Sequence, residues 1–194
     1  MPAARVRAIT PEGREQRERI LQAALELFTA HGFRGASLDA VAAAVGISRQ
    51  GVLHYFPSKT DLLLGVLDLR DDEGAARAER AGGNLIDNLL AAVEHNQREP
   101  DLTRLFTVLA GESAAPQHPG HERFQERYRA VRAALALSIV EAQDAGELRA
   151  DLDPVTVATL IAAAMDGLQL QFLLDPESVD MIEPLSQLLK LLRA

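Results

Sequence analysis

The sequence of 194 residues contains no cysteine and no tryptophan, and aromatic residues make up only 4% of it. Without cysteine the protein has no disulfide, no thiolate nucleophile and no cysteine-ligated zinc site, which is compatible with a reducing compartment. Apolar residues still make up 47% of the chain, so it can bury a core, and that core must be aliphatic. Alanine and leucine dominate, and both favour helix.

Signals of secretion, membrane insertion and catalysis are also missing. Residues 1–19 are charged and lack an apolar segment, so we expect no signal peptide. The longest apolar runs, such as residues 157–165, are shorter than the roughly 20 residues of a membrane-spanning helix. The sequence has no G-x-S-x-G motif and no phosphate loop, so we expect neither an enzyme nor a bound cofactor. These absences predict a soluble cytoplasmic protein.

One pair of histidines is spaced as H-x-x-H, at His118 and His121, and such a pair could hold a metal ion. Pro119 and Gly120 lie between them and predict a loop, and no carboxylate motif completes the ligand set. We therefore expect no metal site.

Charge is divided unevenly along the chain, whose net charge is −8. Residues 1–60 carry eight basic and five acidic side chains, a net charge of +3, so the remaining residues carry twelve basic and 23 acidic ones, a net charge of −11. A basic segment on an acidic protein gains by releasing counterions from a polyanion, and this gain orients the protein. The first 60 residues are therefore the candidate for binding nucleic acid.

Apolar residues recur at helical spacing, and no alternating β-branched pattern appears, which predicts an all-α fold with about nine helices. Thr10 and Pro11 start the first helix, and Gly32 ends it, with Phe33 folding back onto its last turn. Residues 1–9 are either a loose terminus or a basic arm that contacts DNA. We expect helices at residues 11–31, 38–45, 49–55, 58–78, 84–98, 101–113, 119–145, 154–174 and 178–193.

Residues 37–59, SLDAVAAAVGISRQGVLHYFPSK, have the spacing of a helix-turn-helix DNA reader followed by the start of another helix. Gly46 stands at the turn, where a left-handed backbone is needed. Ser37 and Ser48 stand at the two N-cap positions, where a hydroxyl oxygen can accept a hydrogen bond from a free backbone amide. The residues expected to pack the two helices together are Val41, Ala42, Val45, Ile47, Val52 and Tyr55.

Three segments resemble the TetR family of bacterial transcriptional regulators: RERILQAALELF, HGFRGASLDAVAAAVGIS and HYFPSKTDLL, all within residues 17–63. The segment DGLQLQFLLDP at residues 166–176 is similar to one subgroup of such regulators. The resemblance implies a DNA-binding domain at residues 1–59 and a ligand-binding and dimerisation domain at residues 60–194, connected by the helix at residues 58–78. It implies a repressor that a small-molecule effector releases from a palindromic operator.

Two positions depart from the family pattern. Leu53 stands where family members often have an aromatic residue, and Gly51 stands where they often have threonine. Both positions commonly face DNA in the family. We therefore expect base contact to shift toward Arg49 and Gln50, or toward an apolar contact between Leu53 and a thymine methyl group.

The helix at residues 49–55 is expected to lie in the major groove. Arg49 either donates to guanine O6 and N7 or contacts a phosphate, and Gln50 either pairs with adenine or is solvated. Tyr55 either contacts a phosphate or packs in the core, and Lys59 is either a clamp on the DNA backbone or a surface lysine. The predicted DNA-binding residues are Ser37, Ser48, Arg49, Gln50, Gly51, Leu53, His54, Tyr55 and Lys59.

An effector pocket is expected where polar and aromatic side chains stand among apolar ones on the helices between residues 84 and 174. Its predicted residues are His95, Phe106, Glu112, Phe124, Tyr128, Met165, Gln169 and Phe172, with Gln171 as a further polar candidate. Ligand binding would shift the population between two positions of the helix at residues 58–78.

The last two helices are apolar beyond one narrow stripe, which predicts either a four-helix bundle with a second subunit or an ordinary core within one chain. The predicted dimer interface is Ala158, Ile161, Ala162, Met165, Leu168, Met181, Leu185, Leu188 and Leu189, with Leu160, Ala164, Gly167, Phe172, Ile182 and Leu192 on the same helices. The rival interpretation is a helical module that binds a protein partner and no specific DNA sequence. The basic first 60 residues favour DNA.

Overall fold

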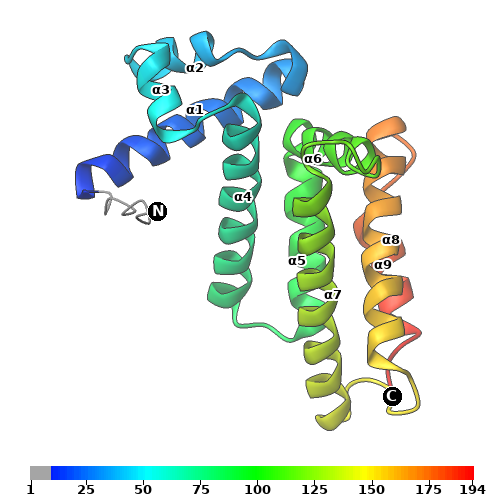
Figure 1. Cartoon of the computed structure of the whole chain (residues 1–194). Coiled ribbons are helices and arrows are strands. Elements are labelled where there is room, and N and C mark those ends of the chain that lie inside the picture. Colours follow the sequence, from blue (N-terminus) through cyan, green and yellow to red (C-terminus); the bar gives the residue numbers. More distant parts are fainter. Residues whose placement is uncertain (1–9) are drawn as a thin grey trace. The chain divides into compact units, whose positions relative to one another are not determined.

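The computed structural model describes residues 10–194, apart from the side chains of Ala75, Ala78 and Ala81. Those residues form nine helices and one isolated antiparallel bridge, Leu148–Arg193, so the predicted all-α fold is confirmed (Figure 1). The possible arm at residues 1–9 lies outside the described residues. The helices are α1 (Pro11–Gly35), α2 (Leu38–Val45), α3 (Arg49–Tyr55), α4 (Lys59–Ala81), α5 (Leu85–Arg98), α6 (Pro100–Glu112), α7 (His121–Asp144), α8 (Pro154–Leu174) and α9 (Ile182–Lys190).

Two helices differ most from their predicted bounds. α1 continues to Gly35, and the chain is kinked at Gly32, where φ is 68° and ψ is 166°. α9 begins at Ile182 instead of residue 178, because the Asp180 carboxylate accepts hydrogen bonds from the backbone N–H groups of Ile182 and Glu183, at 3.2 and 3.0 Å. A carboxylate in this position caps a helix and fixes where it starts.

The chain divides into two compact units between Arg70 and Asp71, inside α4. We call the unit that ends at Arg70 the head and the unit that begins at Asp71 the body. Apolar side chains from all four helices of the head form its core, so the first part of α4 belongs with the helix-turn-helix. This core includes Ile20, Ala24, Phe28, Val41, Val45, Val52, Leu62, Leu63, Val66 and Leu67.

Gly65 marks the tightest packing around α4 in the head. A Cβ atom at this position would lie 2.9 Å from Leu21 Cδ2 and 2.9 Å from Phe56 Cε1. Leu21 and Phe56 are both buried, so a side chain at this position would require them to shift within the core of the head. The absence of a side chain at Gly65 therefore lets α4 approach α1 closely.

The body contains the rest of α4 and helices α5 to α9. α7 and α8 lie side by side, and α5 packs against α9 (Figure 1). One apolar cluster joins α5, α7, α8 and α9, and its fully buried members include Val93, Ile139, Ile161, Met181 and Leu185. Each of these four helices therefore contributes to a single core.

Most of the residues predicted for the dimer interface belong to this core. Six of the nine predicted residues are buried within the single chain: Ala158, Ile161, Ala162, Met181, Leu185 and Leu189. The other three, Met165, Leu168 and Leu188, are partly buried against the same cluster. These side chains pack the chain's own core, because α8 packs against α5 and α7, and α9 packs against α5.

The outer side of α8 carries large apolar residues as well, among exposed polar ones such as Thr159 and Asp166. Val155, Leu160, Leu170 and Leu174 are exposed on it, as are Leu137 and Val140 on α7. By length and composition α8 could cross a membrane, so the expectation that no segment is long and apolar enough was wrong; 28% of the relevant window is buried in the body. A single helix of this kind is weak evidence for a membrane protein, because core helices of soluble proteins can be equally long and apolar. What the burial does show is that much of α8 remains uncovered by its own chain.

Candidate nucleic-acid interface

The turn between α2 and α3 is built by local hydrogen bonds. Gly46 adopts the left-handed conformation, with φ of 71° and ψ of 31°, and the Ile47 N–H donates to Ala42 O at 3.0 Å. Ser37 Oγ accepts from the Ala40 N–H, and Ser48 Oγ accepts from the Gly51 N–H, each at 3.1 Å. The predicted turn glycine and both predicted serine caps are confirmed. Together they fix where α2 ends and where both helices begin.

The sequence of α3 divides cleanly between an inner and an outer side. Val52 is fully buried against the core of the head. Arg49, Gln50 and His54 are exposed, and Leu53 is partly exposed. Since residues four apart share a helical face, Arg49 with Leu53 and Gln50 with His54 form one outer surface. We call Arg49, Gln50, Leu53 and His54 the α3 face.

Gly51 and Tyr55 flank the α3 face and are partly buried. A Cβ atom at Gly51 would lie 3.3 Å from Ile47 Cδ1, so the Ile47 side chain occupies the space into which a larger residue would reach. The His54 and Tyr55 rings meet edge to face, with centroids 5.3 Å apart. Tyr55 is therefore held at the border between core and surface.

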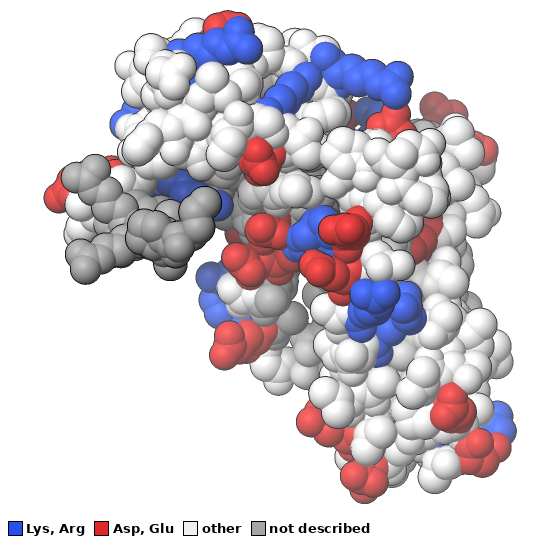
Figure 2. Space-filling view, in the orientation of Figure 1, with Lys and Arg blue, Asp and Glu red and all other residues white. Residues whose placement is uncertain are grey.

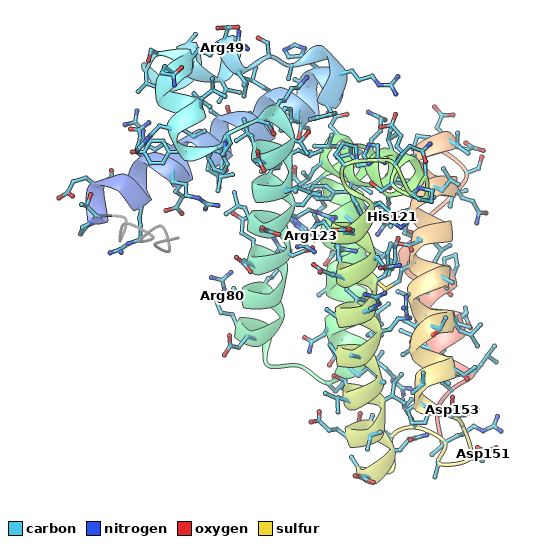
Figure 3. The ribbon with its side chains drawn as sticks, in the orientation of Figure 1. Arg49, Arg80, His121, Arg123, Asp151 and Asp153 are labelled. Carbon is cyan, nitrogen blue, oxygen red and sulfur yellow. The ribbon has the colours of Figure 1, made fainter. Side chains whose placement is uncertain are left out.

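Arg49 has an acidic neighbour that the sequence analysis missed. Its Nη1 atom lies 3.4 Å from Oδ2 of Asp39, which stands in the first turn of α2. Figure 3 shows Arg49 on the outer side of α2 and α3. The two residues are ten positions apart, and only the conformation of the turn brings them together. Periodicity within one helix carries no signal for such a contact.

Lys59 has contacts within the head. Its Nζ atom donates to Arg34 O at 3.3 Å and lies 4.6 Å from the centroid of the Phe33 ring. Burial lowers the pKa of Lys59 below its usual value. The ring of Phe33 packs against Phe28 as predicted, at a centroid distance of 5.7 Å. Lys59 therefore ties the start of α4 to the end of α1.

The predicted pocket residues come from four helices of the body that pack on one another: α5, α6, α7 and α8. Phe106, Phe124 and Phe172 are buried, and the other five are partly buried. By contrast, Gln171 is exposed and donates to Gly167 O on its own helix at 3.3 Å, which removes it from the candidates.

Tyr128 has the most defined polar contact of this set. Its hydroxyl donates to Oδ2 of Asp166 at 2.7 Å and so links α7 to α8. Burial, together with the hydrogen bond to Asp166 and its negative charge, raises the pKa of Tyr128 to about 12. The phenol therefore stays protonated, and remains a donor, at neutral pH.

The second part of α4 is held to α7 by two arginines. Asp71 accepts from Arg123 Nη2 and from Arg127 Nε, each at 2.8 Å. All three side chains are mostly buried, between 22% and 26% exposed. Figure 3 shows Arg123 reaching from α7 toward α4. These pairs span more than 50 residues of sequence, which is why the sequence analysis missed them.

The two histidines of the H-x-x-H pair serve the connection between α6 and α7. His118 Nδ1 lies 2.9 Å from Ser113 Oγ and accepts from the Gly120 N–H at 3.1 Å. His121 Nδ1 lies 2.8 Å from Ser113 O. Both rings therefore fold the connection around Ser113, which is buried.

Charged side chains of both signs lie on the head and on the body. Figure 2 shows several basic side chains on the visible face of the head, and acidic side chains mixed with basic ones on that of the body. Among described residues, Arg14, Arg17, Arg19, Arg34, Arg49 and Lys59 are the basic side chains of the head up to residue 60. Over residues 10–70, the described part of the head, seven basic side chains are matched by seven acidic ones. Two of the three excess basic charges of the first 60 residues come from Arg5 and Arg7, which lie outside the described residues.

Comparisons with known proteins cover both units. TtgW of Pseudomonas putida, an HTH-type transcriptional regulator described as uncharacterized, is 41% identical over 64 residues, which are 33% of this chain and 48% of TtgW. TtgR of the same species, also an HTH-type transcriptional regulator, is 26% identical over 187 residues, 91% of this chain and 89% of TtgR. The chain thus spans about half the length of TtgW but nearly all of TtgR.

A solved structure from Rhodococcus sp. has the same fold. It is described as a TetR-family transcriptional regulator and superposes with a TM-score of 0.80 at 23% identity, over 93% of this chain and all of the other. Residues 20–66 match the bacterial regulatory proteins of the tetR family, and residues 84–193 match the C-terminal domain of BetI-type transcriptional repressors. With both units matched, the chain belongs to the TetR family of bacterial transcriptional regulators.

Proposed function

We propose that this protein is a dimeric repressor that binds a palindromic operator through the α3 face and is released by a small-molecule effector. Regulators of the TetR family bind operator DNA and small-molecule effectors and are dimeric. The observation that carries the proposal is the exposed α3 face on a helix-turn-helix whose inner side is fixed by the buried Val52.

In this proposal α3 lies in the major groove. Arg49 contacts guanine O6 and N7, Gln50 contacts adenine, and the Leu53 side chain packs on a thymine methyl group. Ser37, Ser48, His54 and Tyr55 contact phosphates, which set the register without reading sequence. Gly51 allows the DNA to approach the helix closely. Lys59 remains a candidate phosphate contact, with one of its three donors already used within the head.

A single helix of seven residues makes too few contacts to specify a site, so two heads must act together. Two half-sites would lie about 34–36 Å apart, or a multiple of this distance. A two-fold axis relating two copies of the chain produces such an arrangement and makes the operator palindromic.

We place the dimer contact on the outer side of α8, which revises the residues and keeps only the first of the two helices predicted for the interface. Val155, Leu160, Leu170 and Leu174 would pack against the same residues of a second copy. Between them, Ala163 is exposed, and the space beside Gly167 is open, so two helices can approach closely there. A second copy would cover the apolar area that α8 leaves exposed, which is the reason to prefer this side.

The proposed dimer also bears on localisation and on where an effector binds. In a dimer the exposed apolar side chains of α8 are buried without a membrane, which supports a soluble cytoplasmic protein. The effector would bind among α5, α6, α7 and α8, near His95, Glu112, Tyr128, Met165 and Gln169, with the buried phenylalanines beside it. An inducer and a co-repressor would act in the same way: each would bind one of two conformations of the protein more tightly and so raise the population of that conformation.

Coupling to DNA would run through α4. Its first part lies in the core of the head, through Leu62, Leu63 and Val66. Its second part is bound to α7 at Asp71, and α7 is bound to α8 through Tyr128. A ligand that displaces α7 would shift α4 and so change the distance between the two α3 helices.

The alternative is a helical module whose head binds a protein. It has less support, because a protein partner would not require the exposed Arg49 and Gln50 beside two serine-capped helix starts. Arg49→Ala and Lys59→Ala separate the two cases. A variant series in which neither change alters DNA binding would favour the protein partner.

The decisive experiment is selection of bound duplexes from a random pool, repeated at two salt concentrations and read by sequencing. We expect a palindrome with one half-site spacing, enriched at both salt concentrations. Binding that enriches no sequence and weakens as salt rises would mean that the head binds DNA only through its positive charge, and the proposal would fail.

A further inference from the structure

We propose that Asp39 is a positioning residue that makes Arg49 selective for guanine. The inference rests on the proposed function and deepens it, because it names what determines specificity on the α3 face. Asp39 itself need not touch DNA. It acts through the orientation and the charge of Arg49.

Two capped helix starts hold the pair in place. Asp39 is the second residue of α2, whose first turn is fixed by the bond between the Ala40 N–H and Ser37 Oγ. Arg49 is the first residue of α3, whose first turn is fixed by Ser48 Oγ. The distance of 3.4 Å between Arg49 Nη1 and Asp39 Oδ2 therefore joins two backbone positions that are both constrained.

The contact leaves Arg49 able to read a base. A guanidinium group has five N–H donors in one plane, and guanine accepts only two of them, through O6 and N7. A carboxylate that engages Nη1 limits the rotation of the guanidinium and leaves the Nε and Nη2 edge for guanine. An Arg49 that is already oriented loses less rotamer entropy when it binds.

The contact with Asp39 also lowers the free energy that Arg49 gains by contacting a DNA phosphate. The charges of Asp39 and Arg49 cancel, so binding of this pair to DNA releases fewer counterions than binding of an unpaired arginine would. The Asp39 carboxylate also repels a neighbouring phosphate. Asp39 thus weakens Arg49 on every sequence while keeping its contact with guanine, and the ratio between specific and random binding rises.

Stability cannot be the main consequence of this pair. The side chains are 60% and 67% exposed, and exposed ion pairs contribute little to the free energy of folding. Replacing Asp39 should therefore leave the head folded, which makes the test clean.

The test compares wild-type protein with Asp39→Asn and Asp39→Glu. Each is used for selection from random duplexes and for titration of one random-sequence duplex over a range of salt. For Asp39→Asn we expect the preference for guanine at the position read by Arg49 to fall by about five- to tenfold, at the low end of the range for one bidentate contact. We expect tighter binding to the random duplex, with a slope of log affinity against log salt that is steeper by up to about one. Asp39→Glu should restore much of the base preference.

Glu26→Gln is the control, because it removes the same charge from an exposed position on α1. If it changes random binding as much as Asp39→Asn does, net charge alone explains the gain. Melting curves of the variants should match those of the wild type.

Three outcomes would overturn the inference. If Asp39→Asn binds all sequences more tightly by one common factor, with the base profile unchanged, then Arg49 contacts a phosphate and Asp39 is only a negative charge. If the wild type selects no sequence at all, the proposed function fails first and the inference fails with it. A wild type that selects a palindrome, together with an unaltered guanine preference in Asp39→Asn, would contradict the inference alone.

Discussion

The head and the body expose different kinds of side chain. On α3 the head leaves polar and charged residues in solvent, and its only fully buried side chain there is Val52. On α8 the body leaves Leu160, Leu170 and Leu174 in solvent, while Ile161 on the same helix is buried. A polar surface with basic side chains suits a polyanion, and an apolar surface suits another protein surface. The difference indicates that one chain carries two binding surfaces, and each can be tested without changing the other.

The largest effect is expected from removing the second head. Leu160→Glu places a charge on the exposed side of α8, where two copies would bury it. We expect a monomer by sedimentation, and operator affinity lower by roughly 100-fold or more because the two heads no longer bind as one unit. Leu137→Glu on α7 is the matched control: a monomer from Leu137→Glu but a dimer from Leu160→Glu would move the interface to α7.

A smaller loss is expected on the surface of the head. Arg49→Ala should lower operator affinity by about 1–3 kcal/mol and relax the preference at one base pair of each half-site. Lys59→Ala should instead weaken binding to all sequences alike. Sedimentation of both variants should still show the wild-type association state. If Arg49→Ala leaves the selected sequence intact, Arg49 is not a base reader.

Two glycines of α4 compare the packing of the two units directly. Gly65→Ala in the head places a methyl group 2.9 Å from Leu21 and Phe56, and overpacking of this kind costs about 1–3 kcal/mol. Gly74→Ala in the body meets no atom within 4 Å, so it should stabilise α4 by up to about 1 kcal/mol. Thermal unfolding followed by circular dichroism measures both. Equal effects of the two changes would show that α4 is not packed as described.

The success of sequence reasoning also differs between the two units. Gly46, Ser37 and Ser48 were predicted correctly, because a turn and two caps depend on neighbours within a few residues. The apolar character of α8 was visible too, but a helix that is apolar on most sides does not reveal which side faces its own core. Most of the residues predicted for the dimer therefore lie on the side that faces the chain's own core. Tertiary contacts such as Asp71 with Arg123 leave no periodic pattern at all.

The tie between α4 and α7 gives a prediction specific to the body. Asp71→Asn removes the charge that accepts two arginine hydrogen bonds, and a bond to a charged group is worth roughly 1.5–3 kcal/mol. Because Asp71 is 26% exposed, we expect a loss near the lower value. Hydrogen exchange should rise in the second part of α4 and the start of α7. Asp72→Asn, at an exposed position, is the matched control and should leave exchange unchanged.

The smallest effect concerns Tyr128. Its pKa in the folded protein, about 12, lies above the ordinary value of 10.0, so the folded state holds the phenolic proton longer than the unfolded state does. The contribution of Tyr128 to stability is therefore complete below about pH 10 and is lost as pH rises toward 12. Ultraviolet titration should show one late tyrosinate that disappears in Tyr128→Phe. If the late step survives in that variant, the bond to Asp166 does not protect the proton.

The measurement that tests the account most directly is selection of duplexes by the wild type and by Leu160→Glu, side by side. The wild type should enrich a palindrome of two half-sites with fixed spacing. Leu160→Glu should enrich one half-site alone, with the same bases opposite Arg49, because the α3 face is intact while the second head is gone. A palindrome recovered from both proteins would contradict the dimer on α8, and a different half-site sequence would contradict the independence of the two surfaces.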